Sequence, residues 1–190
     1  MRKFAIIFLL LGALGSTAGA QQTRRPAAKP EDTGPVTVIR SVTLQIPIAS
    51  DAVTVFSYLS DQQKLAMWFP DQAILEPRFG GKYHFRWNKQ EGVWSGMVTE
   101  FLAANTLAFT WKPPTDDYET QVRFKLYPQG GQTLVELAHT GFPAADALDK
   151  AVKGWVFYLK NLKSVIEEQT DLRQTVGKTA KHLPAHPTTN

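Results

Sequence analysis

The chain has 190 residues, a formal net charge of +4 and no cysteine. This length is enough for one domain with a hydrophobic core. The absence of cysteine excludes disulfides, thiol nucleophiles and thiolate metal sites. The excess of cations lies in residues 1–35 and 171–190, so the stretch between them is close to neutral. A nucleic-acid-binding protein needs cations clustered on a folded face, and we therefore expect no nucleic-acid partner.

The N-terminus has the pattern of a secretory signal peptide over residues 1–20. Two basic residues precede an apolar run, residues 4–14, which is shorter than the about 20 residues that a membrane-spanning helix needs. Ala18 and Ala20 form an A-x-A cleavage motif. The sequence predicts cleavage after Ala20, no membrane anchor afterwards, and a periplasmic or secreted protein; an uncleaved anchor is the alternative. Residues 21–35 are rich in proline and polar residues, and we expect a disordered linker there.

The first structured region is expected to be a strand followed by two short helices. Residues 36–46 are β-branched and alternate between apolar and polar side chains, which predicts a strand that Pro47 ends. Ser50 can cap a helix over residues 51–59. A second short helix is expected over residues 61–67.

A series of strands separated by turn residues follows. The expected strands cover residues 72–76, 82–87, 93–102, 106–112, 119–127 and 133–139. Gly80 and Gly81 mark a tight turn before the second of them. In most of these strands apolar side chains alternate with polar ones, which indicates one buried face. Glu100 and Arg123 are interpreted mainly as a structural or solvated pair on two of the strands.

The strongest helical pattern covers residues 145–168. Its large apolar residues recur at spacings of four and three and therefore share one stripe: Leu148, Val152, Trp155, Leu159, Leu162 and Ile166. Such a stripe needs a broad apolar surface, which the face of an antiparallel meander can supply. The sequence thus predicts an α+β domain over residues 36–170, in which a curved antiparallel sheet of about six to seven strands wraps a long C-terminal helix. Residues 171–190 are expected to form a flexible tail.

Six short motifs stand in a fixed order along residues 36–168. They are Trp68-Phe69-Pro70, Pro77-x-Phe79-Gly80-Gly81-x-Tyr83-x-Phe85, Gly96-x-Val98-x-Glu100, Leu107-x-Phe109-x-Trp111, His139-x-Gly141 and Gly154-Trp155-x-x-Tyr158-Leu159. Together they resemble the START-like helix-grip superfamily, often called SRPBCC, and within it the C-terminal-domain family of the heat-shock chaperone ATPase activators. The resemblance implies a helix-grip fold with a cavity between sheet and helix. Most members bind apolar or amphipathic small molecules, and a minority are cyclases, aromatases or hydrolases.

Aromatic residues on the inferred inward faces are the candidates for a ligand pocket. The predicted ligand-binding residues are Trp68, Phe85, Trp87, Phe109, Trp111, Phe124, His139, Trp155 and Leu159. The alternative is that these side chains fill the core, and the sequence leaves open which of the two holds. Gly154 is interpreted as a small residue that lets the sheet or a ligand come close to the helix. We expect an apolar or amphipathic ligand and no cofactor.

His139 is expected on the apolar face of its strand, with Val135 and Leu137. It is either a satisfied buried histidine, a polar anchor for a ligand, or a general base in a cyclase- or hydrolase-like enzyme. Catalysis needs a second group directed at the same point, and no such group is evident. The sequence therefore predicts no catalytic residue.

A metal site and a partner-binding role are two further possibilities. His182 and His186 have a spacing that two metal ligands on a helix can have, but Pro184 lies between them and a third ligand is lacking, so no metal site is expected. A chaperone-like or protein-partner-binding module is the third hypothesis, and it predicts a closed cavity and a large exposed apolar patch. Export would separate the protein from a cytosolic chaperone. The oligomeric state is not predicted.

Overall fold

The computed structural model describes residues 38–175. The predicted signal peptide with Ala18 and Ala20, the linker, and His182 and His186 of the tail lie outside the described residues. In the described part of the chain, no helix is long and apolar enough to cross a membrane.

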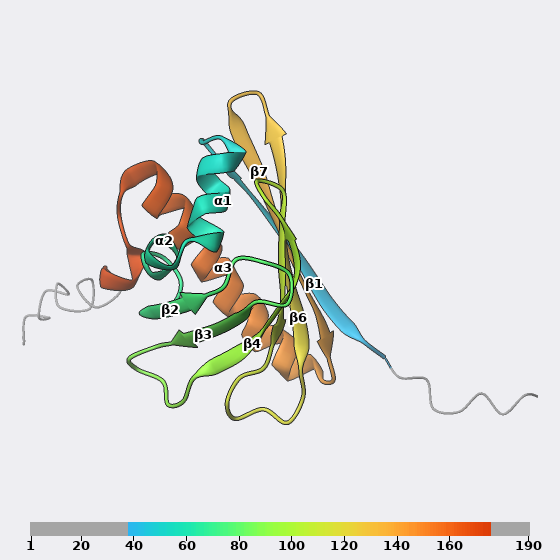
Figure 1. Ribbon diagram of the computed structural model, residues 1–190. Coiled ribbons are helices and arrows are strands. Elements are labelled where there is room, and N and C mark those ends of the chain that lie inside the picture. The colour runs from blue at the N-terminus through green and yellow to red at the C-terminus, as the bar shows by residue number, and fades with distance from the viewer. Residues whose placement is uncertain (1–37, 176–190) are drawn as a thin grey trace, which may run out of the picture. The chain divides into compact units, whose positions relative to one another are not determined.

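Within residues 38–175, seven strands and three α-helices follow the predicted order (Figure 1). The strands are β1 (Arg40–Ile48), β2 (Gln72–Leu75), β3 (Lys82–Arg86), β4 (Trp94–Leu102), β5 (Thr106–Trp111), β6 (Thr120–Gln129) and β7 (Gln132–Phe142). The helices are α1 (Ala52–Ser60), α2 (Gln62–Ala66) and α3 (Ala145–Glu168), followed by a short 3-10 turn, η1 (Leu172–Gln174). The bounds of α3 are those that the apolar stripe predicts.

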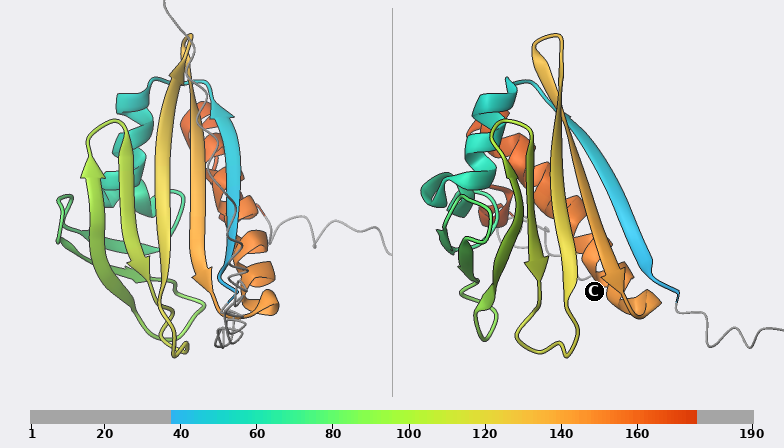
Figure 2. Two further views of the ribbon diagram at one scale, coloured as in Figure 1. Left: turned by 90° about the vertical axis from the view of Figure 1, so that its right-hand side faces the viewer. Right: turned by 45° about the vertical axis from the view of Figure 1, so that its right-hand side comes forward.

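The strands form one antiparallel sheet in the order β1-β7-β6-β5-β4-β3-β2. The strands from β2 to β7 are a meander, and β1 joins its far edge beside β7. Helix α3 crosses one face of the curved sheet and contacts β1 and β7, while α1 contacts β6 and β7 (Figure 2). The predicted helix-grip fold, with a curved sheet around a long C-terminal helix, is confirmed.

Alternation of side chains decides which face of the sheet is buried. In β7, Val135, Leu137 and His139 are buried, whereas Glu136 between them is partly exposed. Strand β3 shows the same pattern, with Tyr83 and Phe85 buried. Successive side chains of a strand point to opposite faces, so the inward residues of all strands meet on the side of α3.

Two local predictions at the start of the domain are wrong. Pro47 does not end the first strand, because β1 lies at the sheet edge and continues to Ile48, with Pro47 paired to Leu134. An edge strand tolerates a proline, since the missing N–H is not needed on its unpaired side. The cap of α1 is Asp51 and not Ser50: the Asp51 carboxylate accepts a hydrogen bond from the Thr54 backbone N–H at 2.9 Å.

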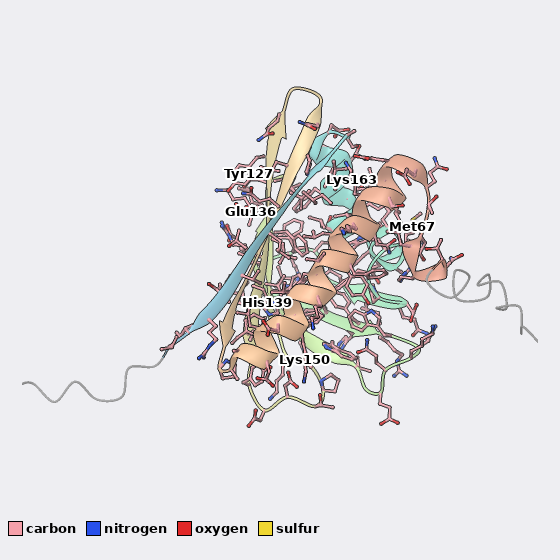
Figure 3. All side chains as sticks on the ribbon, turned by 180° about the vertical axis from the view of Figure 1, so that it is seen from behind. Met67, Tyr127, Glu136, His139, Lys150 and Lys163 are labelled. Carbon is pink, nitrogen blue, oxygen red and sulfur yellow. The ribbon has the colours of Figure 1, made fainter. Side chains whose placement is uncertain are left out.

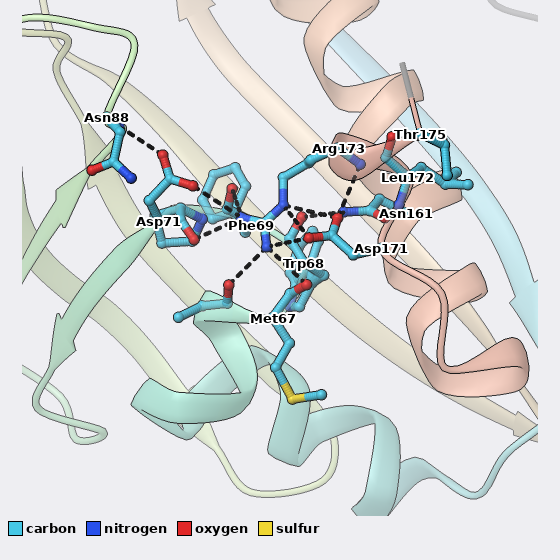
Figure 4. A network of polar contacts seen from close by, with 12 residues as sticks. Met67, Trp68, Phe69, Asp71, Asn88, Asn161, Asp171, Leu172, Arg173 and Thr175 are labelled. Atoms are coloured by element: carbon cyan, nitrogen blue, oxygen red, sulfur yellow. Dashed lines mark hydrogen bonds and ion pairs between the residues drawn. The ribbon is translucent and has the colours of Figure 1, made fainter. Parts of the chain in front are cut away.

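The chain after α3 is attached to the domain as far as it is described. We call residues 171–175 the C-terminal clasp. The Arg173 guanidinium donates hydrogen bonds at 2.9 Å to the carbonyl oxygens of Ala66, Met67 and Pro70, and it is held by the Asp171 carboxylate at 2.8 Å (Figure 4). The expected flexible tail therefore does not begin at residue 171. Its remainder, residues 176–190, lies outside the described residues.

Asn161 of α3 completes the attachment of the clasp. Its side-chain amide donates to the Trp68 carbonyl oxygen at 2.8 Å and to Asp171 at 3.0 Å, and its own oxygen accepts the Leu172 N–H at 2.7 Å. The buried amide is thus fully used, which fits the rule that buried polar groups are paired. The C-terminal half of α3, the clasp and the turn after α2 form one hydrogen-bonded unit (Figure 4).

Candidate functional site

A cleft of about 620 Å³ opens at the N-terminal end of α3. It lies between the first half of α3, the start of β4, the ends of β5 and β7, and the loop that joins β5 to β6. The side of α3 that faces it carries small residues one turn apart, Ala147, Ala151 and Gly154. An ideal Cβ built on Gly154 would meet no atom within 4 Å. These small residues leave space between the helix and the sheet, beside the larger α3 side chains of Trp155 and Tyr158 that also line the cleft.

Aromatic rings form the deep walls of the cleft. Phe69 lies at their centre: its ring stacks on Trp155 with centroids 5.1 Å apart and meets Trp87 and Tyr158 edge-on at 5.2 and 4.9 Å. Trp111 lies 5.9 Å from both Phe69 and Trp155. Phe69 also lines the small space in the core below, so its ring separates the cleft from the core.

His139 is fixed in one tautomer by two hydrogen bonds. The indole N–H of Trp155 donates to His139 Nδ1 at 2.8 Å, and this nitrogen must accept because an indole can only donate. The proton of the neutral ring therefore lies on Nε2, which is 2.7 Å from Thr120 Oγ1. The Thr120 hydroxyl donates its own hydrogen bond to the Trp111 carbonyl oxygen at 3.0 Å. Figure 3 shows His139 between the sheet and the first half of α3.

This arrangement makes His139 a structural group. Burial lowers the pKa of His139 from 6.5 to about 3. A general base works best when its pKa lies near the working pH, and here both ring nitrogens are already engaged. His139 lines the cleft, but its role is structural. Its ring binds the Trp155 indole and, through Thr120, the end of β5.

Polar side chains stand at the mouth of the cleft. Asp116 and Tyr118 come from the loop between β5 and β6, and Asp146 and Lys150 come from the first turns of α3. The pKa of the Tyr118 hydroxyl is raised, first by burial, then by its interaction with Asp116, and further by the nearby carboxylates of Asp146 and Asp117. The mouth thus combines charged groups from two elements above an aromatic floor.

The structure divides the predicted ligand-binding residues into two groups. Trp87, Trp111, His139 and Trp155 line the cleft. Trp68, Phe85, Phe109 and Phe124 lie in the core, around a space of about 10 Å³, and Leu159 is buried without lining either space. A space of that size holds at most one water molecule. The question that the sequence left open therefore has two answers, because the interior is filled below Phe69 and open above it.

Several lining residues were not among the predicted ones. Phe69 stood in the Trp68-Phe69-Pro70 motif, Trp94 stood in an alternating strand, and Tyr158 follows Trp155 by one helical turn. The small residues of α3 repeat at a helical spacing, which is a signal that the sequence contains. The acidic loop residues gave no such signal, since loop geometry decides where they point.

Other candidate groups lie elsewhere or are lacking. Glu100 and Arg123 form a two-bonded ion pair at 2.8 and 3.2 Å. Arg123 alternates with the buried residues of β6, and a β-bulge between Val98 and Glu100 brings Glu100 to the same outer face. They cannot assist His139, since the sheet separates them from the cleft. Within residues 38–175, no group of three His, Cys, Asp or Glu side chains could hold a metal ion.

Solved structures with the same fold share only low sequence identity with the chain. Protein MLL2253 from Mesorhizobium loti is 20% identical, with a TM-score of 0.62 over 69% of this chain and 99% of that one. CalU16 from Micromonospora echinospora is 22% identical, with a TM-score of 0.60 over 74% of this chain and 85% of that one. The Aha1 dimer from Colwellia psychrerythraea is 20% identical, with a TM-score of 0.61 over 67% of this chain and 96% of that one. At these identities the similarity shows the fold alone.

Sequence comparison identifies the family. A search of curated proteins finds no match to the chain. The family model described as "Activator of Hsp90 ATPase homolog 1-like protein" matches residues 50–167, which is more than half of the chain and contains α1 to α3 with the whole meander. The chain therefore belongs to the activator of Hsp90 ATPase homolog 1-like family of START-like helix-grip proteins.

Proposed function

We propose that this protein is an exported binding protein that takes an amphipathic small molecule into the cleft at the N-terminal end of α3. The observation that carries the proposal is the cleft of about 620 Å³ with aromatic walls and a polar mouth. Its volume lies within the range of roughly 300–1,000 Å³ that small-molecule sites occupy. Family membership supports a module that binds a ligand or acts like a chaperone activator, and the cleft favours the former.

The arrangement of the cleft fits an amphipathic ligand better than a polar one. The rings of Phe69, Trp87 and Trp155 contact one another at the bottom, so an apolar group placed there would replace water on aromatic surface. The charged groups stand only at the mouth, where the polar part of a ligand would stay close to solvent. His139 cannot serve as a free polar anchor at depth, because both of its nitrogens are engaged.

The two alternatives predict features that differ from this site. A cyclase- or hydrolase-like enzyme based on His139 would need a ring nitrogen that is free to take a proton near neutral pH, whereas burial lowers the pKa of His139 to about 3. A partner-binding module without a ligand predicts a closed cavity, whereas this one is open. A folded variant that no longer binds the ligand would separate the binding-protein hypothesis from the enzyme and the partner-binding module.

Tryptophan fluorescence can test binding directly. Four of the five tryptophans, Trp87, Trp94, Trp111 and Trp155, line the cleft. Titration with a set of alkyl and aromatic probes should change the emission with saturation, and the variant Gly154→Leu should abolish the change, because leucine would project into the open space above Gly154. Val156→Leu on an exposed part of the same helix is the control and should bind as the wild type does. Binding that survives in Gly154→Leu would place the ligand elsewhere.

Export is a separate part of the proposal and has its own test. The basic and apolar N-terminus with Ala18 and Ala20 supports cleavage after Ala20. The full chain, made in a bacterial host, should be recovered from the periplasmic fraction with Gln21 as its first residue, as intact-mass spectrometry would show. A chain that keeps residues 1–20, or that remains in the cytoplasm, would contradict export and leave the binding proposal standing.

A further inference from the structure

We infer that the ligand of the cleft carries a positively charged amine or quaternary ammonium group beside its apolar part. This inference rests on the proposed function and specifies its ligand class. It follows from two properties of the cleft that favour a cation together: the aromatic character of its walls and the excess of carboxylates at its mouth.

Aromatic side chains from four parts of the chain converge on the cleft. Trp87 follows β3, Trp94 opens β4, Trp111 ends β5, and Trp155 and Tyr158 lie on α3. A tryptophan ring attracts a cation through the negative potential of its face, and sites that bind quaternary ammonium groups use several such rings. Aromatic walls alone would also accept a neutral group, so the charge at the mouth decides between the two.

The mouth carries more negative than positive charge. Asp116 and Asp146 line it from two elements, one on the loop after β5 and one on the first turn of α3. Asp117 and Glu119 continue the acidic loop. Neither Asp116 nor Asp146 forms an ion pair within residues 38–175. The pKa of Tyr118 is raised first by burial and then by both carboxylates, Asp116 more than Asp146.

Lys150 is the cation that argues for the opposite ligand. It lines the cleft one helical turn after Asp146, and it forms no ion pair within the described residues. Among the residues that line the cleft, one ammonium group stands against two carboxylates, so the lining itself has a net negative charge. The Arg40 guanidinium lies at the edge, where it donates to the Pro143 carbonyl oxygen at 2.9 Å. An anionic ligand held by Lys150 is therefore the outcome that would overturn the inference, and Lys150 provides the control variant.

Three probes with one alkyl chain separate charge from apolar binding. Octyltrimethylammonium, octanol and octanoate can be titrated into the full mature chain at neutral pH and low salt, with tryptophan fluorescence and calorimetry as readouts. We expect octyltrimethylammonium to bind about tenfold more tightly than octanol, which corresponds to a cation–π contribution between that of an exposed site and that of a desolvated one. Octanoate should bind more weakly than octanol, and added salt should reduce the difference between the two charged probes.

Isosteric variants assign the preference to the mouth. Asp116→Asn and Asp146→Asn should each weaken octyltrimethylammonium about threefold, since exposed charge pairs contribute modestly, and leave octanol unchanged. Lys150→Gln should not weaken octyltrimethylammonium, because it removes the one ammonium group that lines the mouth. Equal affinity for the three probes would overturn the cation inference while the proposed function stands. Tighter octanoate that depends on Lys150 would overturn it in favour of an anionic ligand. If none of the probes binds, the proposed function fails together with the inference.

Discussion

The two halves of α3 cover the same sheet in different ways. At its C-terminal half, Leu162 and Val165 are buried against the core, and Asn161 binds the clasp. At its N-terminal half, alanines and a glycine face the sheet across an open cleft. The fold is thus held at one end and left open at the other.

The difference shows how a helix-grip domain can be stable and hollow at once. Close-packed side chains and satisfied polar groups at one end supply stabilisation. The other end keeps its walls in place by ring contacts around Phe69 and by the hydrogen bonds of His139, without filling the space. Substitutions at the two ends should therefore separate loss of stability from loss of binding.

The largest expected effect is on the filled half. Leu162→Ala should lower the free energy of unfolding by about 2–5 kcal/mol, since it creates a cavity at a fully buried position. Leu148→Ala, on the same stripe but partly exposed near the cleft, should cost clearly less. Urea denaturation of the two variants measures both values. Equal losses at the two positions would contradict the proposed division of the helix.

The clasp offers a second test of the closed end. Arg173→Ala should lower the free energy of unfolding by about 2 kcal/mol, because it leaves the carbonyl groups of Ala66 and Met67 without their charged donor and frees Asp171. Arg123→Ala is the matched control, since its ion pair with Glu100 is largely solvated and should be worth about 1 kcal/mol or less. A clasp variant as mild as the control would show that residues 171–175 do not stabilise the domain.

The burial of His139 in the wall of the cleft predicts that the stability of the protein depends on pH. The pKa of His139 is about 3 in the folded state and near its ordinary 6.5 in the unfolded chain. Between these values the unfolded chain binds one more proton, so stability is greatest above pH 6.5 and falls as the pH falls, by up to about 1.4 kcal/mol per pH unit. Thermal or urea unfolding between pH 7 and 5 measures this slope, because carboxylates ordinarily titrate at lower pH and contribute little there.

Two variants assign that slope to the histidine. His139→Leu should be less stable at pH 7, because the Trp155 N–H loses its acceptor, but its slope between pH 7 and 5 should be clearly smaller. Thr120→Val keeps the ring and should keep the slope. An unchanged slope in His139→Leu would show that other groups cause the acid sensitivity.

Periodic patterns were enough to predict the fold. The stripe on α3 and the alternation in β6 and β7 depend only on the spacing of apolar residues, and both were read correctly. Local details failed where tertiary context decides. Pro47 is compatible with a strand because β1 lies at an edge, and Arg173 is ordered by backbone carbonyl groups, which have no signature in a sequence.

The site was only partly visible in the sequence for a related reason. Alternation along strands predicts that Trp87, Trp111 and His139 point inward, and the helical stripe predicts the same for Trp155; all four line the cleft. Whether an inward residue borders a cleft or a filled core depends on the volume that faces it across the interior. Phe85 therefore lies in the core although it shares its strand face with Trp87.

The smallest expected effect has the opposite sign and concerns Gly154. Glycine within a helix is less stable than alanine by about 0.5–1 kcal/mol, and the added Cβ at Gly154 would meet no atom within 4 Å. Gly154→Ala should therefore raise the free energy of unfolding by about that amount, as urea denaturation would show. Gly96→Ala is the contrasting variant, because its Cβ would lie 2.5 Å from Thr110 Oγ1 and 2.7 Å from the Tyr83 ring, and it should destabilise. If Gly154→Ala also destabilised, the helix would lie closer to the sheet there than the open cleft allows.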